Sequence, residues 1–107
     1  MPIFAGEMKN TFLVHIELPE VFTTRFMALI PKHRSIVNKL LEKRILLSYS
    51  LDMERQNVWA FFDAKDEKEV MDILSTLPII KEVKINKISE LAFYDSAPIG
   101  LPDIIMN

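Results

Sequence analysis

The sequence predicts a small α+β domain whose elements follow in the order strand, helix, strand, strand, helix, strand. Two observations support this prediction. Apolar and polar residues alternate in four segments, and apolar residues recur every three or four positions in the two intervening segments. A length of 107 residues fits one domain. We therefore treat residues 1–107 as a single domain, with a core of about 10–94 and a C-terminal tail at 95–107.

The first strand and the first helix are predicted between residues 10 and 41. Residues 10–18 alternate to give one wholly apolar face, made of Phe12, Val14, Ile16 and Leu18. His15 and Glu17 then face the other way. Helical spacing runs from Phe22 to Leu41, with Thr23 or Thr24 as the N-cap. Because Pro31 interrupts it, we expect either one kinked helix or a break at which Pro31 opens a second helix.

An antiparallel hairpin is predicted from residues 45–52 and 58–63. The first segment alternates between a more apolar set, Ile45, Leu47, Tyr49 and Leu51, and a set with more polar members, Leu46, Ser48, Ser50 and Asp52. The second, "VWAFFD", is rich in residues that favour strands. A short polar turn separates them, which favours direct antiparallel pairing.

The second helix and the last strand are predicted between residues 66 and 94. Asp66 followed by Glu69 resembles a capping box, and apolar spacing continues to Leu77. Since a residue before proline is disfavoured in a helix, the helix should end near Leu77, before Pro78. Residues 79 and 80 should then pack under the sheet edge. A fourth strand is expected over 83–94, with one face made of Val83, Ile85, Ser89, Leu91 and Phe93.

This element order is that of a ferredoxin-like βαββαβ fold with an antiparallel four-stranded sheet. Two helices cover only one face of such a sheet. Half of the residues are hydrophobic and seven are Phe, so we expect a second copy of the chain to cover the other face in a dimeric α/β barrel. The expected assembly is a homodimer or a higher oligomer. The tail at 95–107 is expected either to be disordered or to form a strap over the partner subunit.

Composition argues against several classes of partner and cofactor. The net charge is −2 with no basic block, so we expect no nucleic acid partner. No apolar run approaches the about 18 residues of a membrane span, and residues 1–10 lack a signal-peptide pattern. There is no cysteine, and the two histidines lie 18 positions apart, which predicts no metal site. We therefore expect a cytoplasmic protein without a cofactor.

The second half of the chain resembles muconolactone delta-isomerase and its relatives in the dimeric α/β barrel superfamily. The resemblance depends on "FFDAKDEKEVMDILSTLPII", with Phe62-Asp63, residues 72–75 and Leu77-Pro78 at the family's spacing, and it extends from about His33 to about Leu91. The chain also departs from that family. Arg44 stands where a glycine commonly follows the first helix, and Pro31-x-His33 is similar to a motif of YCII-like proteins.

Two groups of side chains are candidates for chemistry. The first would line a pocket on the sheet face away from the helices, with His15 and Glu17 as catalytic residues and Ser50 and Asp52 as substrate-binding residues. The second is His33, on the apolar side of the first helix, with Arg34 as a clamp for a substrate carboxylate. The alternative for His15 is a strand histidine that only makes a structural hydrogen bond, and the alternative for His33 and Arg34 is a surface pair beside a kink. Trp59 and Tyr49 are expected in the core or the barrel wall.

Three functions remain open from the sequence. The resemblance implies a cofactor-free isomerase that moves a proton on a small lactone or carboxylate. A noncatalytic small-ligand-binding or structural barrel protein is the alternative. A third is another enzyme on the same fold, such as a monooxygenase or a lyase.

Overall fold

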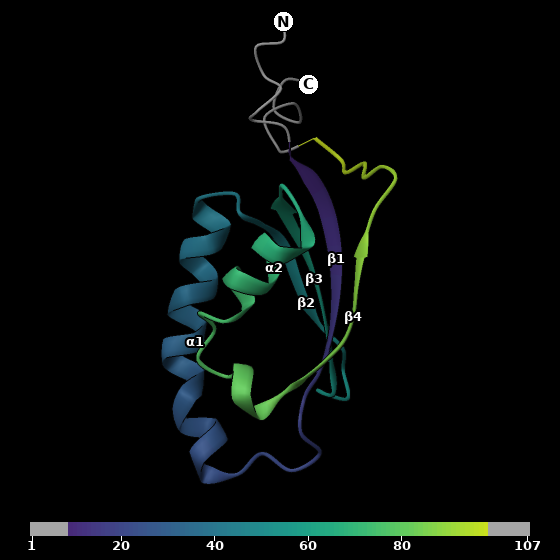
Figure 1. The fold of residues 1–107 in the computed structure, drawn as a ribbon. Helices are drawn as coiled ribbons and strands as arrows, with labels where there is room; N and C mark the ends of the chain where they lie inside the picture. The colour runs from purple at the N-terminus through teal and green to yellow at the C-terminus, as the bar shows by residue number, and fades with distance from the viewer. Residues whose placement is uncertain (1–8, 99–107) are drawn as a thin grey trace, which may run out of the picture.

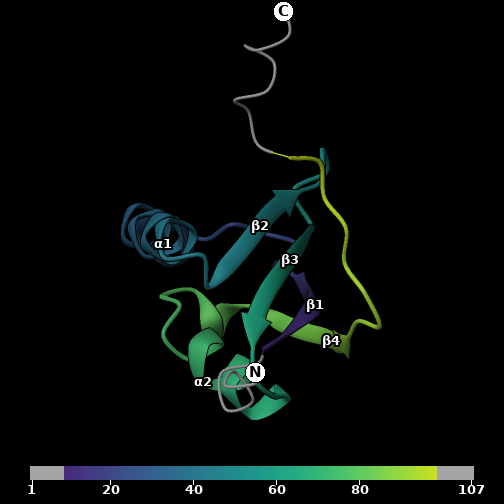
Figure 2. The ribbon, with the colours of Figure 1, turned by 90° about the horizontal axis from the view of Figure 1, so that it is seen from above.

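The computed structural model describes residues 9–98, which form a layer of two helices on one side of a sheet (Figures 1 and 2). The elements in chain order are β1 (Asn10–Glu17), α1 (Thr24–Glu42), β2 (Leu46–Leu51), β3 (Asn57–Ala64), α2 (Glu67–Leu74), a 3₁₀ turn η2 (Ile80–Glu82) and β4 (Lys84–Glu90). The sheet order is β2-β3-β1-β4, and each neighbouring pair is antiparallel. The predicted α+β class and element order are confirmed, and the arrangement is compatible with a ferredoxin-like fold.

The core lies between the helices and one face of the sheet. β1 contributes Phe12, Val14 and Ile16, as predicted, and all three are buried. They lie opposite Phe62, Ala60 and Val58 of β3, which are buried as well. The inner faces of the helices add further buried apolar residues, namely Phe26, Val37, Val70 and Leu74. The opposite sheet face is the open face, and β1 presents His15 there, paired with Trp59.

Helix α1 continues through Pro31 without a break, which settles the alternative left open by the sequence. Its N-cap is Thr23, whose hydroxyl oxygen accepts a hydrogen bond from the backbone N–H of Phe26 at 3.1 Å. The C-terminus turns through Arg44 in the left-handed conformation at φ 59°. The N–H of Ile45 then bonds the carbonyl of Leu40 at 3.0 Å, which closes a Schellman motif.

Strand β2 contains a bulge that the alternating pattern did not predict. Leu46 lies opposite Phe62 while Ser48 lies opposite Phe61, so Leu47 is an extra residue in the ladder. The prediction that Leu46 shares a face with Ser48 was therefore wrong, because Leu46 is buried in the core. Beyond the bulge, Tyr49 and Ser50 alternate as expected, and Tyr49 packs against the core.

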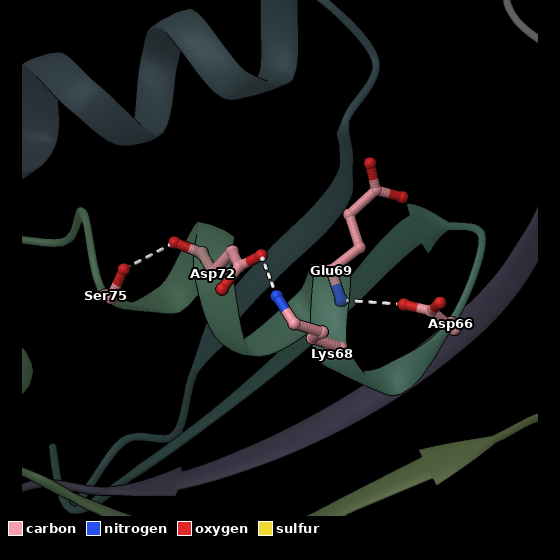
Figure 3. Close-up of polar contacts among 5 residues, drawn as sticks. All are labelled: Asp66, Lys68, Glu69, Asp72 and Ser75. Atoms are coloured by element: carbon pink, nitrogen blue, oxygen red, sulfur yellow. Dashed lines mark hydrogen bonds and ion pairs between the residues drawn. The ribbon is translucent and has the colours of Figure 1, made fainter.

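Helix α2 begins as the capping pattern predicts (Figure 3). A side-chain oxygen of Asp66 accepts the N–H of Glu69 at 2.8 Å, as a cap does. The Glu69 carboxylate accepts the N–H of Lys65 at 2.7 Å, whereas a full capping box would use the N–H of Asp66. Further along, Lys68 and Asp72 form an exposed ion pair at 3.3 Å. The helix ends at Leu74 rather than near Leu77, because tighter i to i+3 bonds to the carbonyls of Ile73 and Leu74 replace its last turn. Leu77 and Ile79 remain buried.

Strand β4 is shorter than predicted and carries the second bulge of the sheet. It covers Lys84–Glu90 instead of 83–94. Ile85 pairs with Ile16 and Ile88 with Val14, so residues three apart share the core face and Asn86 is the extra residue. The expected face of Val83, Ile85, Ser89, Leu91 and Phe93 is therefore wrong from Asn86 onward. After β4 the chain runs on the side of the sheet away from the helices (Figure 2), where Tyr94 contacts Phe61 with ring centroids 5.1 Å apart.

Of the predicted tail, residues 95–98 are exposed, and the remainder, 99–107, lies outside the described residues, so the strap stays a prediction. Within residues 9–98, no helix has the length and apolar character that crossing a membrane requires.

The cap of α2 gives a test of the fold with a matched control. We expect Asp66→Ala to lower the free energy of unfolding by about 1 kcal/mol, because it removes the acceptor for the Glu69 N–H. Asp72→Ala removes a carboxylate from the same helix but only an exposed pair, so the change should stay below about 0.5 kcal/mol. Urea unfolding of both variants measures the difference, and equal losses would contradict the assignment of Asp66 as the cap.

Candidate functional site

A cavity of about 500 Å³ lies between α1 and the sheet, at the end where the β2–β3 turn approaches the helix. Its walls are mostly apolar, with Phe26, Met27 and Ile30 from the start of α1 and Leu18, Phe22, Leu51, Val58 and Ile79 from other parts of the fold. Four polar side chains also line it: His33, Arg34, Tyr49 and Arg55. An apolar cavity with a few convergent polar groups is the usual form of a small-molecule site.

His33 and Tyr49 are paired within this lining. His33 follows Phe26 and Ile30 on the inner face of α1, and only 3% of its surface is exposed. Its Nε2 lies 2.7 Å from the hydroxyl oxygen of Tyr49 on β2. The expectation that His33 faces the sheet is thus confirmed. Among residues 9–98, no group bonds its Nδ1, and a buried polar atom without a partner costs about 1 to 3 kcal/mol. His33 therefore lines the cavity and also carries a buried ring nitrogen without a hydrogen-bond partner among these residues.

Both members of the pair are neutral near pH 7. Burial, with a smaller contribution from the nearby Arg34 charge, lowers the pKa of His33 to about 4. Burial also raises the pKa of Tyr49 to about 12, although Arg34 acts in the opposite direction there. The pair can therefore present one hydroxyl donor and one imidazole nitrogen acceptor to a ligand.

Arg34 and Arg55 mark the opening of the cavity, because both are exposed residues that also line it. Arg34 belongs to α1, whereas Arg55 belongs to the β2–β3 turn, so the two charges come from different elements. Neither forms an ion pair with any carboxylate in the described part of the chain. The positive charge at the opening is thus available to an acidic ligand.

A separate polar network occupies the open face of the sheet. The Nε2 of His15 lies 2.8 Å from Oδ1 of Asn57, and its ring stacks on Trp59 with centroids 5.3 Å apart. Asn57 Nδ2 donates to Asp52 Oδ2 at 2.8 Å. On the other side, Asn86 Nδ2 lies 3.4 Å from His15 Nδ1.

All these contacts are compatible with one arrangement of protons. Asn86 Nδ2 also donates to Glu17 Oε1 at 3.0 Å, so its second hydrogen can go to His15 Nδ1. His15 Nε2 then donates to Asn57 Oδ1. The ring nitrogens are thereby satisfied by side-chain amides, and no carboxylate within residues 9–98 forms a hydrogen bond or ion pair with the imidazole. This histidine is therefore held in place within a complete network.

The structure brings together some of the predicted site residues and separates others. His33 and Arg34 share the cavity. His15, Glu17 and Asp52 belong to the open-face network. Ser50 also lies on the open face, opposite Trp59, but none of His15, Glu17, Ser50 and Asp52 lines the cavity.

The carboxylate of Asp52 is used in hydrogen bonds that hold the β2–β3 turn. Its Oδ1 accepts the backbone N–H groups of Gln56 and Asn57 at 2.9 and 3.1 Å. The Asn57 side chain, followed by the Gln56 N–H, lowers the pKa of this carboxyl. These bonds use both of its oxygens.

Four residues that contribute to the cavity or to the open-face network were not predicted as site residues. For two of them, Tyr49 and Trp59, the sequence pattern indicated only a location. Tyr49 was expected on the core face, but its partner His33 could not be identified without the helix-to-strand distance. Trp59, expected in the core or barrel wall, does not lie in the core but on the open face, where it is 38% exposed and stacks on His15. Asn86 reaches His15 only because of the β4 bulge, and Arg55 lines the cavity because of its turn conformation. Neither the bulge nor the turn conformation can be recognised from the alternation of apolar and polar residues in the sequence.

Comparison of the chain with models of known protein families and with curated proteins finds no match. In residues 9–98, no three His, Asp or Glu side chains gather as metal ligands would. The geometry of the cavity is therefore the main indication of what this chain does.

The neutral state of His33 predicts how stability depends on pH. Its pKa is about 4 in the folded protein and near 6.5 in an unfolded chain, so only the unfolded state is protonated between these values. Unfolding then takes up about one proton, and stability falls as pH decreases from about 6.5 to about 4. Above about 6.5 the contribution of His33 is constant and fully present.

Urea unfolding at a series of pH values tests this, with His33→Gln and His15→Gln beside the wild type. The difference in unfolding free energy between wild type and His33→Gln should shrink as pH falls through the window. A difference that stays constant, or one that appears only for His15→Gln, would show that His33 is not held neutral by burial.

Proposed function

We propose that this protein is a cofactor-free isomerase that moves a proton on a small, mainly apolar carboxylate or lactone bound in the cavity. The observation that supports this best is the buried, neutral His33–Tyr49 pair, 2.7 Å apart, in an apolar cavity with arginines at its opening. The reaction type agrees with the resemblance to the muconolactone isomerase family. We also propose that the protein is cytoplasmic.

The composition of the cavity supports the class of ligand. Phe22, Phe26 and Ile30 offer apolar surface for a hydrocarbon or ring, and a volume of about 500 Å³ suits a small molecule. Arg34 can bind a carboxylate in bidentate geometry. A ligand with an apolar body and one acidic end therefore matches both kinds of lining.

The pair can supply both an acid and a base in one tautomer. When Nε2–H of His33 donates to the Tyr49 oxygen, the Tyr49 hydroxyl hydrogen is free for a ligand carbonyl and Nδ1 is a free base. In the proposed reaction, Nδ1 takes the proton from carbon next to that carbonyl. The electron pair of the broken C–H bond forms the enolate, whose oxygen is stabilised by Tyr49. Nδ1–H then returns the proton to a different carbon of the conjugated system.

A pKa of about 4 makes His33 a weak base when no ligand is bound, and a bound ligand can raise this pKa. The positive charge of Arg34 is one of the two causes of the low value. A carboxylate bound to Arg34 compensates that charge and places a negative charge near the ring, which favours the imidazolium. In this proposal the acidic group of the substrate therefore activates the base.

A second candidate is a noncatalytic protein that binds the same class of small acid. The observation in its favour is that His33 bonds Tyr49, and neither side chain contacts a carboxylate among residues 9–98. A histidine in a catalytic pair is commonly oriented by a carboxylate. The same cavity would then serve only for binding.

We further propose that the open face pairs with a second copy of the chain to form a dimeric α/β barrel. Trp59 and Phe61 of β3 lie on that face, and Trp59 is 38% exposed. Phe93, which follows β4, is 77% exposed. Burial of such aromatic surface favours association. In that assembly the His15 network would lie at the interface.

Proton exchange tests the isomerase directly. We expect the wild type to incorporate deuterium from deuterated water into muconolactone or a related unsaturated lactone acid, as followed by NMR. His33→Ala should abolish the incorporation, and Tyr49→Phe should slow it by about 10²-fold or more, because it removes the donor to the enolate oxygen.

His15→Ala is the matched control, because it removes the other histidine without changing the cavity lining. Exchange lost in His15→Ala but kept in His33→Ala would move the active site to the open face. Tight binding of these acids without any exchange would favour the noncatalytic candidate.

The assembly is tested by light scattering. The chain has a mass of 12.4 kDa, and we expect a mass about twice that for the wild type at micromolar concentration. Trp59→Lys should shift the protein to monomer, because a charge would be buried at the proposed interface. Met53→Lys, at a 94% exposed position of the β2–β3 turn, should leave the dimer intact. A monomeric wild type would exclude the barrel.

A further inference from the structure

Two arginines of this chain adopt the left-handed backbone conformation that normally favours glycine or asparagine. They are Arg44 at φ 59° and Arg55 at φ 61°. A side chain with a Cβ carries a steric penalty there, so each position would hold a glycine more easily. An arginine at such a position suggests that its side chain has a function. The two arginines differ in whether the side chain lines the cavity.

Arg44 has a sufficient structural explanation. It is the residue after the C-cap of α1, where its N–H bonds the carbonyl of Leu41 at 3.1 Å and the following N–H bonds that of Leu40. Its side chain is exposed and does not line the cavity. Its positive charge near the end of a helix is favourable.

Arg55 is the residue of the β2–β3 turn that adopts the left-handed conformation. Its N–H bonds the carbonyl of Asp52 at 3.0 Å, and the Asp52 carboxylate accepts the next two N–H groups. This network holds the backbone of the turn without using the Arg55 side chain, so glycine would serve the turn as well. The side chain instead lines the cavity, as does that of Arg34 from α1.

We propose that Arg55 is a specificity-determining residue that, together with Arg34, selects ligands with a carboxylate at the opening and an apolar body inside. The inference depends on the proposed function only in that the cavity must bind a small molecule. Two arginines from different elements, without an ion-pair partner among residues 9–98, create a positive opening. Carboxylates bind such a pair through charge-assisted hydrogen bonds, whereas neutral analogues of the same shape gain much less.

Arg34 and Arg55 reach the cavity from different elements. Arg34 already lies close enough to the His33–Tyr49 pair to influence both pKa values, so it belongs to the inner part of the opening. Arg55 adds a charge from the sheet side, carried by a turn that Asp52 holds rigidly. A carboxylate bound by both arginines is then held at the opening, and the apolar part of the ligand is directed toward Phe26 and Ile30.

Calorimetric titration with two probes tests the proposal, using octanoate and its neutral amide, octanamide, on the full chain. We expect the wild type to bind octanoate more tightly, with an affinity that decreases as salt is added. Arg55→Gly should weaken octanoate binding by about tenfold or more and leave octanamide binding unchanged. Arg55→Lys should retain most of the octanoate affinity because it keeps the charge.

Arg44→Gly is the matched control, since it makes the same change at the other left-handed arginine. Both glycine variants should unfold in urea at a midpoint equal to or above that of the wild type, and Arg44→Gly should bind both probes like the wild type. Equal binding of octanoate by wild type and Arg55→Gly would overturn the role of Arg55 while leaving the cavity as a ligand site. Absence of binding of both probes to the wild type would overturn the proposed function and this inference together.

Discussion

The antiparallel pairing of β1 with β3 at the centre of the sheet places every residue of these strands on one of two faces, and both candidate sites depend on it. On the core face, Phe12, Val14 and Ile16 meet Phe62, Ala60 and Val58. A slip of one residue would turn all of them toward the open face, so the burial of this set holds the register. The same register puts His15 beside Trp59 and leaves Val58 in the wall of the cavity.

The two bulges then determine what each histidine contacts. In β2 the extra residue Leu47 lets Leu46 stay in the core and still turns Tyr49 toward α1, where it meets His33. In β4 the extra residue Asn86 carries an amide to His15 and Glu17. A regular strand would keep strict alternation and would place Tyr49 on the face opposite to Leu46. The His33–Tyr49 contact and the contacts of Asn86 thus depend on local irregularities of an otherwise regular sheet.

The difference between regular strands and their irregularities explains which parts of the fold and of the sites were predictable from the sequence. The element order, the core face of β1, the hairpin and the cap at Asp66 follow from local patterns, and the structure confirms them. The orientation of His33 followed from helical spacing with Ile30 and Val37. Its pairing with Tyr49, the reach of Asn86 and the position of Arg55 depend on bulges, on a left-handed turn and on the distance between layers. None of these is set by the composition of one segment, so the sheet-face pocket of His15, Glu17, Ser50 and Asp52 grouped residues that the fold keeps apart from the cavity.

Asp52 connects the two regions, although it belongs to neither as a binding group. One of its oxygens fixes the turn that positions Arg55 at the cavity opening. The other accepts the amide of Asn57, which in turn holds His15 on the open face. A partner subunit on the open face would therefore rest on a network that shares its anchor with the cavity opening. The short polar turn is therefore the part of the fold that the open-face network and the cavity opening have in common.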